Sequence, residues 1–198
     1  MQILSIISSP RGAASYSTKL VNGVVEKLIA AHPGSAVMVR DLTNKPFPHL
    51  EVVHLQSFFT PAESRTPEQQ LAVRHSDEAI AEIMAADTIV IGSPLYNFSI
   101  ASTLKAWIDH IARAGITFQY SAAGPEGLVK GKKVYLAVSS GGVYSEGPMA
   151  TYDFAVPYLQ GVLGFLGMID ITVVRAEGVG MPELEPTALQ KGLDSVSI

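Results

Sequence analysis

Residues 2–20 read QILSIISSPRGAASYSTKL and join a short apolar run to a helical pattern through a loop rich in serine. The run Gln2–Ile7 is nearly all apolar, which is typical of a strand buried on both faces. From about residue 18, apolar residues recur at helical spacing until Pro33-Gly34 stops the helix near residue 31. The loop between them, Ser8–Ser17, is longer than a simple turn needs, so we expect it to hold a ligand.

The same order of short apolar run and helical pattern recurs along the chain. We expect further strands at Ala36–Val39, Thr88–Gly92, Lys133–Val138 and Ile169–Val174, and further helices at 67–86, 104–111, 156–166 and 186–196. Strands covered on both faces and separated by helices indicate a parallel sheet with right-handed crossovers. The sequence therefore predicts an α/β fold, with a five-stranded sheet between two layers of helices. We expect residues 1–198 to form a single domain, with excursions at about 42–66 and 113–131 that carry no clear strand or helix signal.

Composition excludes several classes of protein. The 198 residues are 47% hydrophobic and 16% charged, which is unlike a disordered chain. A net charge of −4 without a basic stripe argues against a nucleic-acid partner. The absence of cysteine rules out a disulfide scaffold, a thiol nucleophile and a zinc–thiolate site, and we expect no metal. No apolar run approaches the roughly 18 residues of a membrane helix, so we expect a cytoplasmic protein with no membrane contact.

Three polar loops follow three of the predicted strands. They are Ser8–Ser17, SPLYNFS at 93–99 and SSGGVYSEG at 139–147. In open parallel sheets, ligands bind beyond the carboxyl ends of the strands, so all three loops should meet at one edge. This clustering is the main functional signal in the chain.

The first loop suits a phosphate group. Its hydroxyls lie next to the start of a helix, where backbone N–H groups are unpaired and the dipole is positive. Neither G-x-x-x-x-G-K-[ST] nor G-x-G-x-x-G occurs here, which excludes the two common phosphate loops. The alternative is that Ser15 or Ser17 only caps the helix.

The other two loops could contact a flat ligand. Tyr96 and Phe98 flank Asn97, and such rings in a loop would cover a planar molecule unless they fold back into the core. Gly141-Gly142 would let the backbone approach a ligand closely, although glycine is also common in ordinary turns.

At these loops the sequence resembles the FMN-dependent NAD(P)H:quinone and azo-dye reductases, which are azoreductases of flavodoxin-like fold. The segments RAGITFQY at 113–120, GPEGLVKGKK at 124–133 and FLG at 165–167 are also similar to this family. The resemblance implies a flavodoxin-like three-layer sandwich with strand order 2-1-3-4-5, non-covalent FMN, and a homodimer with active sites at its interface. The residues it implies for FMN binding are Ser9, Ser15, Tyr16, Ser17, Leu95, Tyr96, Asn97, Phe98, Ser139, Ser140, Gly141 and Gly142.

The resemblance also implies a reaction. A hydride would pass from NADH or NADPH to flavin N5, and two electrons would then pass to a quinone or azo compound in ping-pong order. Because the cofactor carries this chemistry, the chain needs no catalytic dyad. The implied substrate pocket contains Phe118, Tyr120 and Tyr144, with Phe118 reaching the partner's flavin. Tyr144 and Tyr120 are candidate proton donors.

Three other functions were weighed against this one. A flavodoxin-like electron carrier would bind FMN without oxidising NAD(P)H itself. A hydrolase using Ser9, Ser139 or Ser145 is disfavoured because the G-x-S-x-G elbow is missing. A receiver domain is disfavoured because paired acidic residues do not follow the first strand. His110, in an amphipathic helix, is expected at the helix surface and not as a base.

Overall fold

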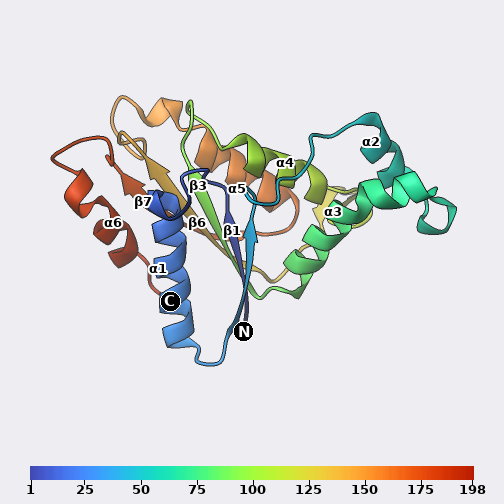
Figure 1. Ribbon diagram of the computed structural model, residues 1–198, viewed down its shortest axis with the longest axis horizontal. Coiled ribbons are helices and arrows are strands. Elements are labelled where there is room, and N and C mark those ends of the chain that lie inside the picture. The colour runs from blue at the N-terminus through green and yellow to red at the C-terminus, as the bar shows by residue number, and fades with distance from the viewer.

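A parallel sheet of five strands forms the centre of the computed structural model, which covers residues 1–198 (Figure 1). Its order is β2-β1-β3-β6-β7, and all four neighbouring pairs are parallel. The strands are β1 (Gln2–Ile7), β2 (Ala36–Asp41), β3 (Thr88–Pro94), β6 (Lys133–Ser140) and β7 (Asp170–Glu177). Counted along the chain, this is the predicted order 2-1-3-4-5, so the fold prediction is confirmed.

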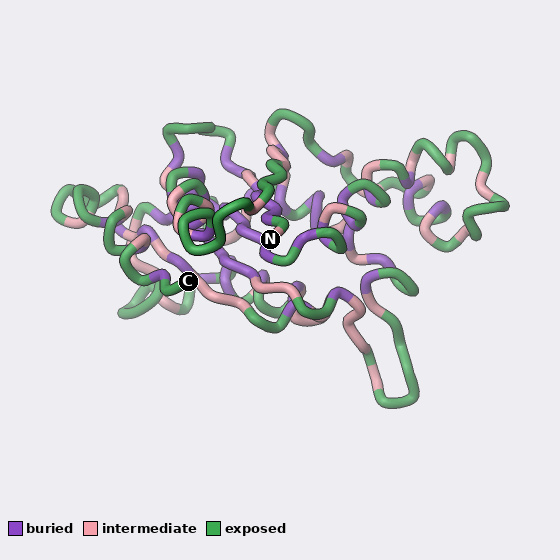
Figure 2. The backbone as a smooth tube through the Cα atoms, turned by 90° about the horizontal axis from the view of Figure 1, so that it is seen from below, coloured by how far each residue is buried: buried purple, intermediate pink, exposed green.

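Helices cover both faces of the sheet. One face carries α1 (Tyr16–Ala31) and α6 (Glu185–Asp194), and the other carries α3 (Pro67–Ala85), α4 (Ser102–Ile111) and α5 (Ala155–Phe165) (Figure 1). The side chains of each strand alternate between two apolar cores, with Ile3 and Val90 facing α1, and Leu4 and Ile89 facing the other layer. Buried residues are concentrated in the middle of the molecule, and exposed residues predominate in the loops at its periphery (Figure 2).

Every strand except β1 and every predicted helix differs by one to three residues from the expected bounds; β2 runs two residues further, and β7 starts one residue later and ends three later. β3 and β6 continue two residues further, because Pro94 still pairs with Ser139. α1 begins at Tyr16, two residues early, because Ser15 already has the extended backbone of a residue that precedes a helix. These shifts bring the site loops closer to the sheet edge than the sequence indicated.

The edge strand β2 departs from the prediction that the strands are covered on both faces. Val37, Met38 and Val39 are 39%, 49% and 59% exposed. Their apolar character follows the strand pattern, but within one chain no helix packs over them.

The two excursions contain regular structure that their sequence did not clearly signal. Residues 42–66 contain α2 (Val52–Phe59) and a short 3₁₀ turn, Ala62–Ser64. Residues 113–131 contain the hairpin of β4 (Phe118–Ser121) and β5 (Gly124–Gly127). α2 starts without a Ser, Thr or Asp cap. Instead, the Glu51 N–H donates to His54 Nδ1 at 3.0 Å, a pairing that start signals in sequence do not include.

His110 is buried, which corrects its predicted place on the helix surface. Its Nε2 lies 2.9 Å from the Pro48 carbonyl oxygen, and the rings of Phe47, His54 and Phe58 surround it. Burial lowers the pKa of the His110 imidazole below its usual value. The first excursion therefore covers His110 and the apolar side chains around it on α4.

No helix in the chain is both long and apolar enough to cross a membrane.

Candidate functional site

The three predicted loops meet at the carboxyl edge of the sheet, because β1, β3 and β6 are neighbours. A cavity of about 210 Å³ lies between them. Its lining residues are Arg11, Ser15, Tyr16, Pro94, Leu95, Tyr96, Ser139, Ser140, Gly141, Val179 and Gly180. Residues from every loop therefore border a single space, as the sequence predicted.

The first loop presents hydroxyls at the start of α1. Ser9 and Ser17 are buried beneath the cavity, and Ser15 Oγ lies 3.0 Å from Ser17 Oγ. Ser15 occupies the capping position, but its side chain accepts no backbone N–H from the helix. Capping alone thus does not explain this serine. Thr18 Oγ1, two residues into the helix, is buried without a partner. The Ser15–Ser17 hydroxyl pair, a helix N-terminus and the nearby Arg11 fit a phosphate.

The second loop is a tight turn with a strained centre. Tyr96 and Ser99 exchange backbone hydrogen bonds of 2.9 and 3.0 Å. Asn97 and Phe98 between them both have positive φ, at 48° and 69°. This is the geometry of a type I′ turn, which normally takes asparagine and glycine. The Phe98 ring is 40% exposed and Tyr96 is 37% exposed, so the rings do not fold back into the core.

The third loop is fixed by its neighbour after β7. Val179 N–H donates to the Ser140 carbonyl, Gly180 N–H to Gly141 at 2.9 Å, and Gly178 N–H to Gly142 at 3.1 Å. A Cβ placed on Gly141 would meet no atom within 4 Å, so this residue faces open space in the cavity. A flat ring can approach its backbone there.

A larger cavity of about 970 Å³ adjoins the first and shares Tyr96 with it. Asn97 lines this second space together with Ser8, Pro10 and Tyr158. Burial raises the pKa of the Tyr158 phenol, which is therefore neutral at physiological pH. The second loop thus lies between two adjoining spaces that both border the serine loop, and the larger one extends to the start of α4.

Phe118 and Tyr120 do not line either cavity within one chain. They lie on the β4–β5 hairpin, where the Phe118 ring packs against Phe165 with centroids 4.6 Å apart. Phe165 ends α5 near the start of β7, at the edge of the sheet opposite the three loops. Tyr120 is 74% exposed. Tyr144 does lie beside the site, with its ring centroid 6.3 Å from that of Phe98.

Sequence reasoning missed five neighbours of the site, among them Pro94 at the end of β3. Arg11 lies inside the serine loop, and Val179 and Gly180 follow β7. The glycines of GVG at 178–180 were a usable signal, because they follow a strand as Gly141-Gly142 do. The Tyr152 ring, 5.2 Å from that of Phe98, gave no signal because it lies on an irregular segment.

No acid–base pair is present in the cavity. Of the tyrosines there, Tyr16 has a raised pKa, chiefly because its hydroxyl donates to the Glu185 carboxylate. That hydroxyl is therefore a poorer acid than usual. The site offers hydroxyls, backbone N–H groups and aromatic edges, which fit FMN, and it leaves the reaction chemistry to the bound group.

The chain belongs to the flavodoxin-like fold family, whose profile matches residues 1–197. It is 51% identical over 197 residues to an FMN-dependent NADH:quinone oxidoreductase of Mesorhizobium japonicum, covering 99% of this chain and 94% of that protein. Identity to a protein of the same name from Aromatoleum aromaticum is 52% over 181 residues, covering 91% and 89%.

Solved structures of azoreductases also superpose on this chain. The azoreductase from Bacillus anthracis str. Sterne superposes with a TM-score of 0.90 at 33% identity, covering 98% of this chain and 95% of that one. An FMN-dependent NADH-azoreductase from Bacillus anthracis str. Ames Ancestor, solved in complex with FMN, superposes with a TM-score of 0.86 at 26% identity, covering 98% and 97%. The family resemblance predicted from the loops is confirmed.

Proposed function

We propose that this protein is an FMN-dependent oxidoreductase that transfers two electrons as hydride from NADH to quinones and azo compounds. One observation carries the proposal: three loops from β1, β3 and β6 line a single cavity, in a chain half identical to proteins named for this activity. The alternative of a hydrolase has no support, because no histidine lines the cavity.

The chain's own residues would bind and orient the cofactor. Bound FMN would supply the redox chemistry, which is hydride acceptance from the nicotinamide and two-electron transfer to the acceptor. We assign the phosphate to Ser9, Ser15, Tyr16 and Ser17 at the start of α1. The ring system would lie against Leu95–Phe98, and the backbone of Ser139–Gly142 would bond its polar edge. Residues 1–198 would act as one FMN-binding domain.

We infer a ping-pong order, because donor and acceptor would each have to lie against the same exposed side of the site. Initial rates at several fixed NADH concentrations should give parallel double-reciprocal lines against quinone. Intersecting lines would mean that both substrates are bound together, which would contradict the inferred order.

We also propose a homodimer with active sites at the interface. Phe118 and Tyr120 lie at the opposite sheet edge from their own site, so only a second copy could bring them to it. In addition, α2 leaves Val52, Leu55 and Phe59 exposed at positions that share one helix face. Light scattering should give twice the mass of the 21.1 kDa chain. A monomer at micromolar concentration would oppose the proposed dimer.

NADH, the proposed donor, is a cytoplasmic metabolite, and we place the reaction in the cytoplasm.

The test of the function is an absorption spectrum of the purified protein, taken before and after anaerobic NADH. We expect a flavin spectrum that bleaches with NADH and returns when a quinone is added. A colourless protein that takes up no added FMN would refute the proposal. The remaining alternative is an electron carrier. It would bind FMN but oxidise NADH no faster than free FMN does.

A further inference from the structure

Glu177, the last residue of β7, holds the backbone of the third loop. Its Oε1 accepts hydrogen bonds from the N–H groups of Tyr144 at 2.7 Å and Ser145 at 2.8 Å. The Ser145 hydroxyl donates to Oε2 of the same carboxylate. Three donors on one carboxylate fix the chain at the point where the Tyr144 ring leaves it.

Asp153 holds the other end of the same segment. Its Oδ1 accepts hydrogen bonds from Ala155 and Val156, the first residues of α5, at 3.1 and 3.0 Å. The adjacent Phe154 N–H donates to the Phe98 carbonyl at 3.1 Å. This end is thereby joined to both α5 and the second loop.

Arg175 connects the two carboxylates. It lies two residues before Glu177 on β7, so both side chains point to the same face of the sheet. Its Nη2 lies 2.6 Å from Asp153 Oδ2, and its Nη1 lies 3.4 Å from Glu177 Oε1. The Arg175 side chain is only 21% exposed. A third cavity, of about 240 Å³, is lined by Arg175, Glu177 and Lys191 among others. Lys191 pairs with neither carboxylate. We call Arg175, Asp153 and Glu177 the carboxylate clamp.

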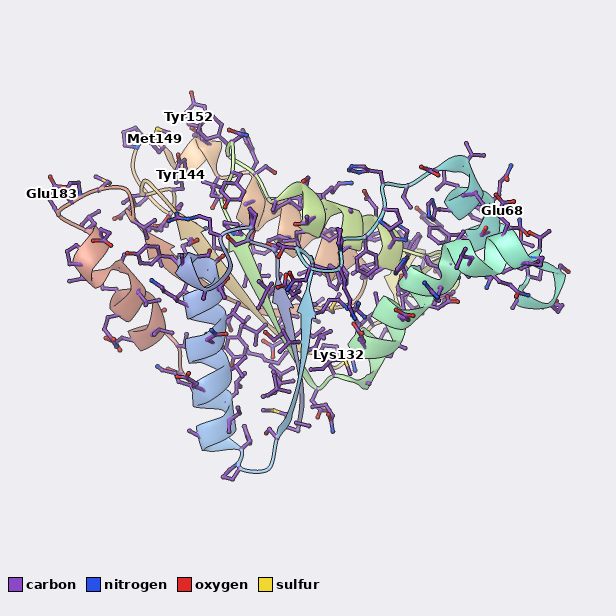
Figure 3. All side chains as sticks on the ribbon, viewed as in Figure 1. Glu68, Lys132, Tyr144, Met149, Tyr152 and Glu183 are labelled. Atoms are coloured by element: carbon purple, nitrogen blue, oxygen red, sulfur yellow. The ribbon has the colours of Figure 1, made fainter.

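The clamp supports a cluster of rings beside the second and third loops of the site. The Phe98 ring centroid lies 6.3 Å from that of Tyr144 and 5.2 Å from that of Tyr152, and we call these three rings the aromatic wall. Tyr144, Met149 and Tyr152 lie together at the same edge of the molecule (Figure 3). Between Tyr144 and Asp153 the chain has only a 3₁₀ turn, Ala150–Tyr152. The positions of Tyr144 and Tyr152 therefore depend on the clamp, whereas Phe98 is held by the turn between Tyr96 and Ser99.

We infer that Arg175 and Glu177 are positioning residues that set the aromatic wall, and that this wall selects acceptors by the extent of their planar rings. The inference rests on the proposed reductase function. A two-ring acceptor can stack against Phe98 and Tyr152, whereas a single small ring gains little from them. Loosening the clamp should thus weaken binding of large flat acceptors while leaving small ones nearly unaffected.

The test compares Arg175→Met and Glu177→Gln with Lys191→Met, which removes a cation from the same small cavity without touching the clamp. KM is measured on the FMN-loaded protein with NADH as donor and either a two-ring naphthoquinone or 1,4-benzoquinone as acceptor. We expect Arg175→Met to raise KM for the naphthoquinone about fivefold and for benzoquinone less than twofold. Glu177→Gln keeps a carbonyl for the two N–H groups and should show a smaller effect, while Lys191→Met should show none.

A second readout does not depend on turnover. Hydrogen–deuterium exchange at the Tyr144 and Ser145 amides should be faster in Arg175→Met and unchanged in Lys191→Met. Tyr152→Ala removes a wall ring that is 46% exposed and should reproduce the KM difference even where Arg175→Met does not fold.

Equal KM changes for both quinones in Arg175→Met and Tyr152→Ala, or unchanged exchange at both amides, would overturn the inference. If the wild-type protein reduced neither quinone, the proposed function would fail instead. The two failures are distinguishable because the first requires an active wild-type enzyme.

Discussion

Replacing Gly141 with valine should weaken FMN binding without unfolding the protein. A Cβ at this position would meet no protein atom within 4 Å, and the backbone has no positive φ that would strain valine. The new side chain would therefore extend into the cavity of about 210 Å³, where the flavin edge is expected. The apoprotein has nothing to clash with, so its free energy of unfolding should change by about 0.5 kcal/mol or less.

The loss of affinity can be estimated from overpacking. Forcing extra methyl groups into an occupied space typically costs about 1–3 kcal/mol. Applied to FMN binding, this corresponds to an increase in Kd of about 5- to 160-fold. The Cβ of Gly142, by contrast, would lie 3.4 Å from the Tyr144 ring, so the same change there would disturb the protein itself.

The assay is a titration of apoprotein with FMN, followed by quenching of flavin fluorescence, together with urea unfolding of the apoprotein. Gly161→Val is the matched control, because a Cβ at that exposed helix position also meets nothing within 4 Å. If Gly141→Val bound FMN as tightly as the wild type, the third loop would not approach the flavin. The assignment of Ser139–Gly142 to its polar edge would then be wrong.

Three further changes test the core, the fold and the chemistry. Burial lowers the His110 pKa, so the stabilisation due to its neutral ring should be full above about pH 6.5 and should decline below it. The midpoints of urea unfolding, measured from pH 7.5 to 5, should therefore fall more in the wild type than in His110→Gln. Gly127→Ala would place a Cβ 2.1 Å from the Gly167 nitrogen and should lower the free energy of unfolding by about 3 kcal/mol or more; a loss under 1 kcal/mol in a denaturant titration would contradict this contact. Tyr144→Phe keeps the ring and should leave the kcat of NADH oxidation within about twofold, whereas a tenfold fall would identify the phenol as a proton donor.

The sheet could be predicted from sequence because its strands carry their own signal. β3 is buried at every residue, and its predicted part, Thr88–Gly92, reads as a mainly apolar run with no need of distant information. Three adjacent strands then bring their loops together whatever the loops contain. This is why Ser15, Tyr96 and Ser139 could be expected in one cavity before any coordinates were available.

The missed features depend on contacts between distant parts of the chain. The burial of His110 requires Pro48, 62 residues away, to close over α4. Glu177 reads as an ordinary strand end, and its role appears only when the amides 32 and 33 residues earlier fold back onto it. α2 was missed for a local reason, since a Glu51–His54 pairing is not among the usual helix start signals.

Phe98 shows how magnitudes separate a structural role from a functional one. A bulky residue with φ of 69° costs about 1–2 kcal/mol relative to the right-handed region, and glycine would remove most of that cost. Its ring contacts with Tyr152 and Tyr144 each stabilise the fold by about 0.5–1.5 kcal/mol at most, and by less here because the ring is partly exposed. The two terms nearly cancel, so stability alone gives no reason for phenylalanine at the tip of this turn. What phenylalanine supplies and glycine does not is an aromatic ring beside the cavity. The clamp beneath the facing tyrosines serves to keep that ring's partners in place.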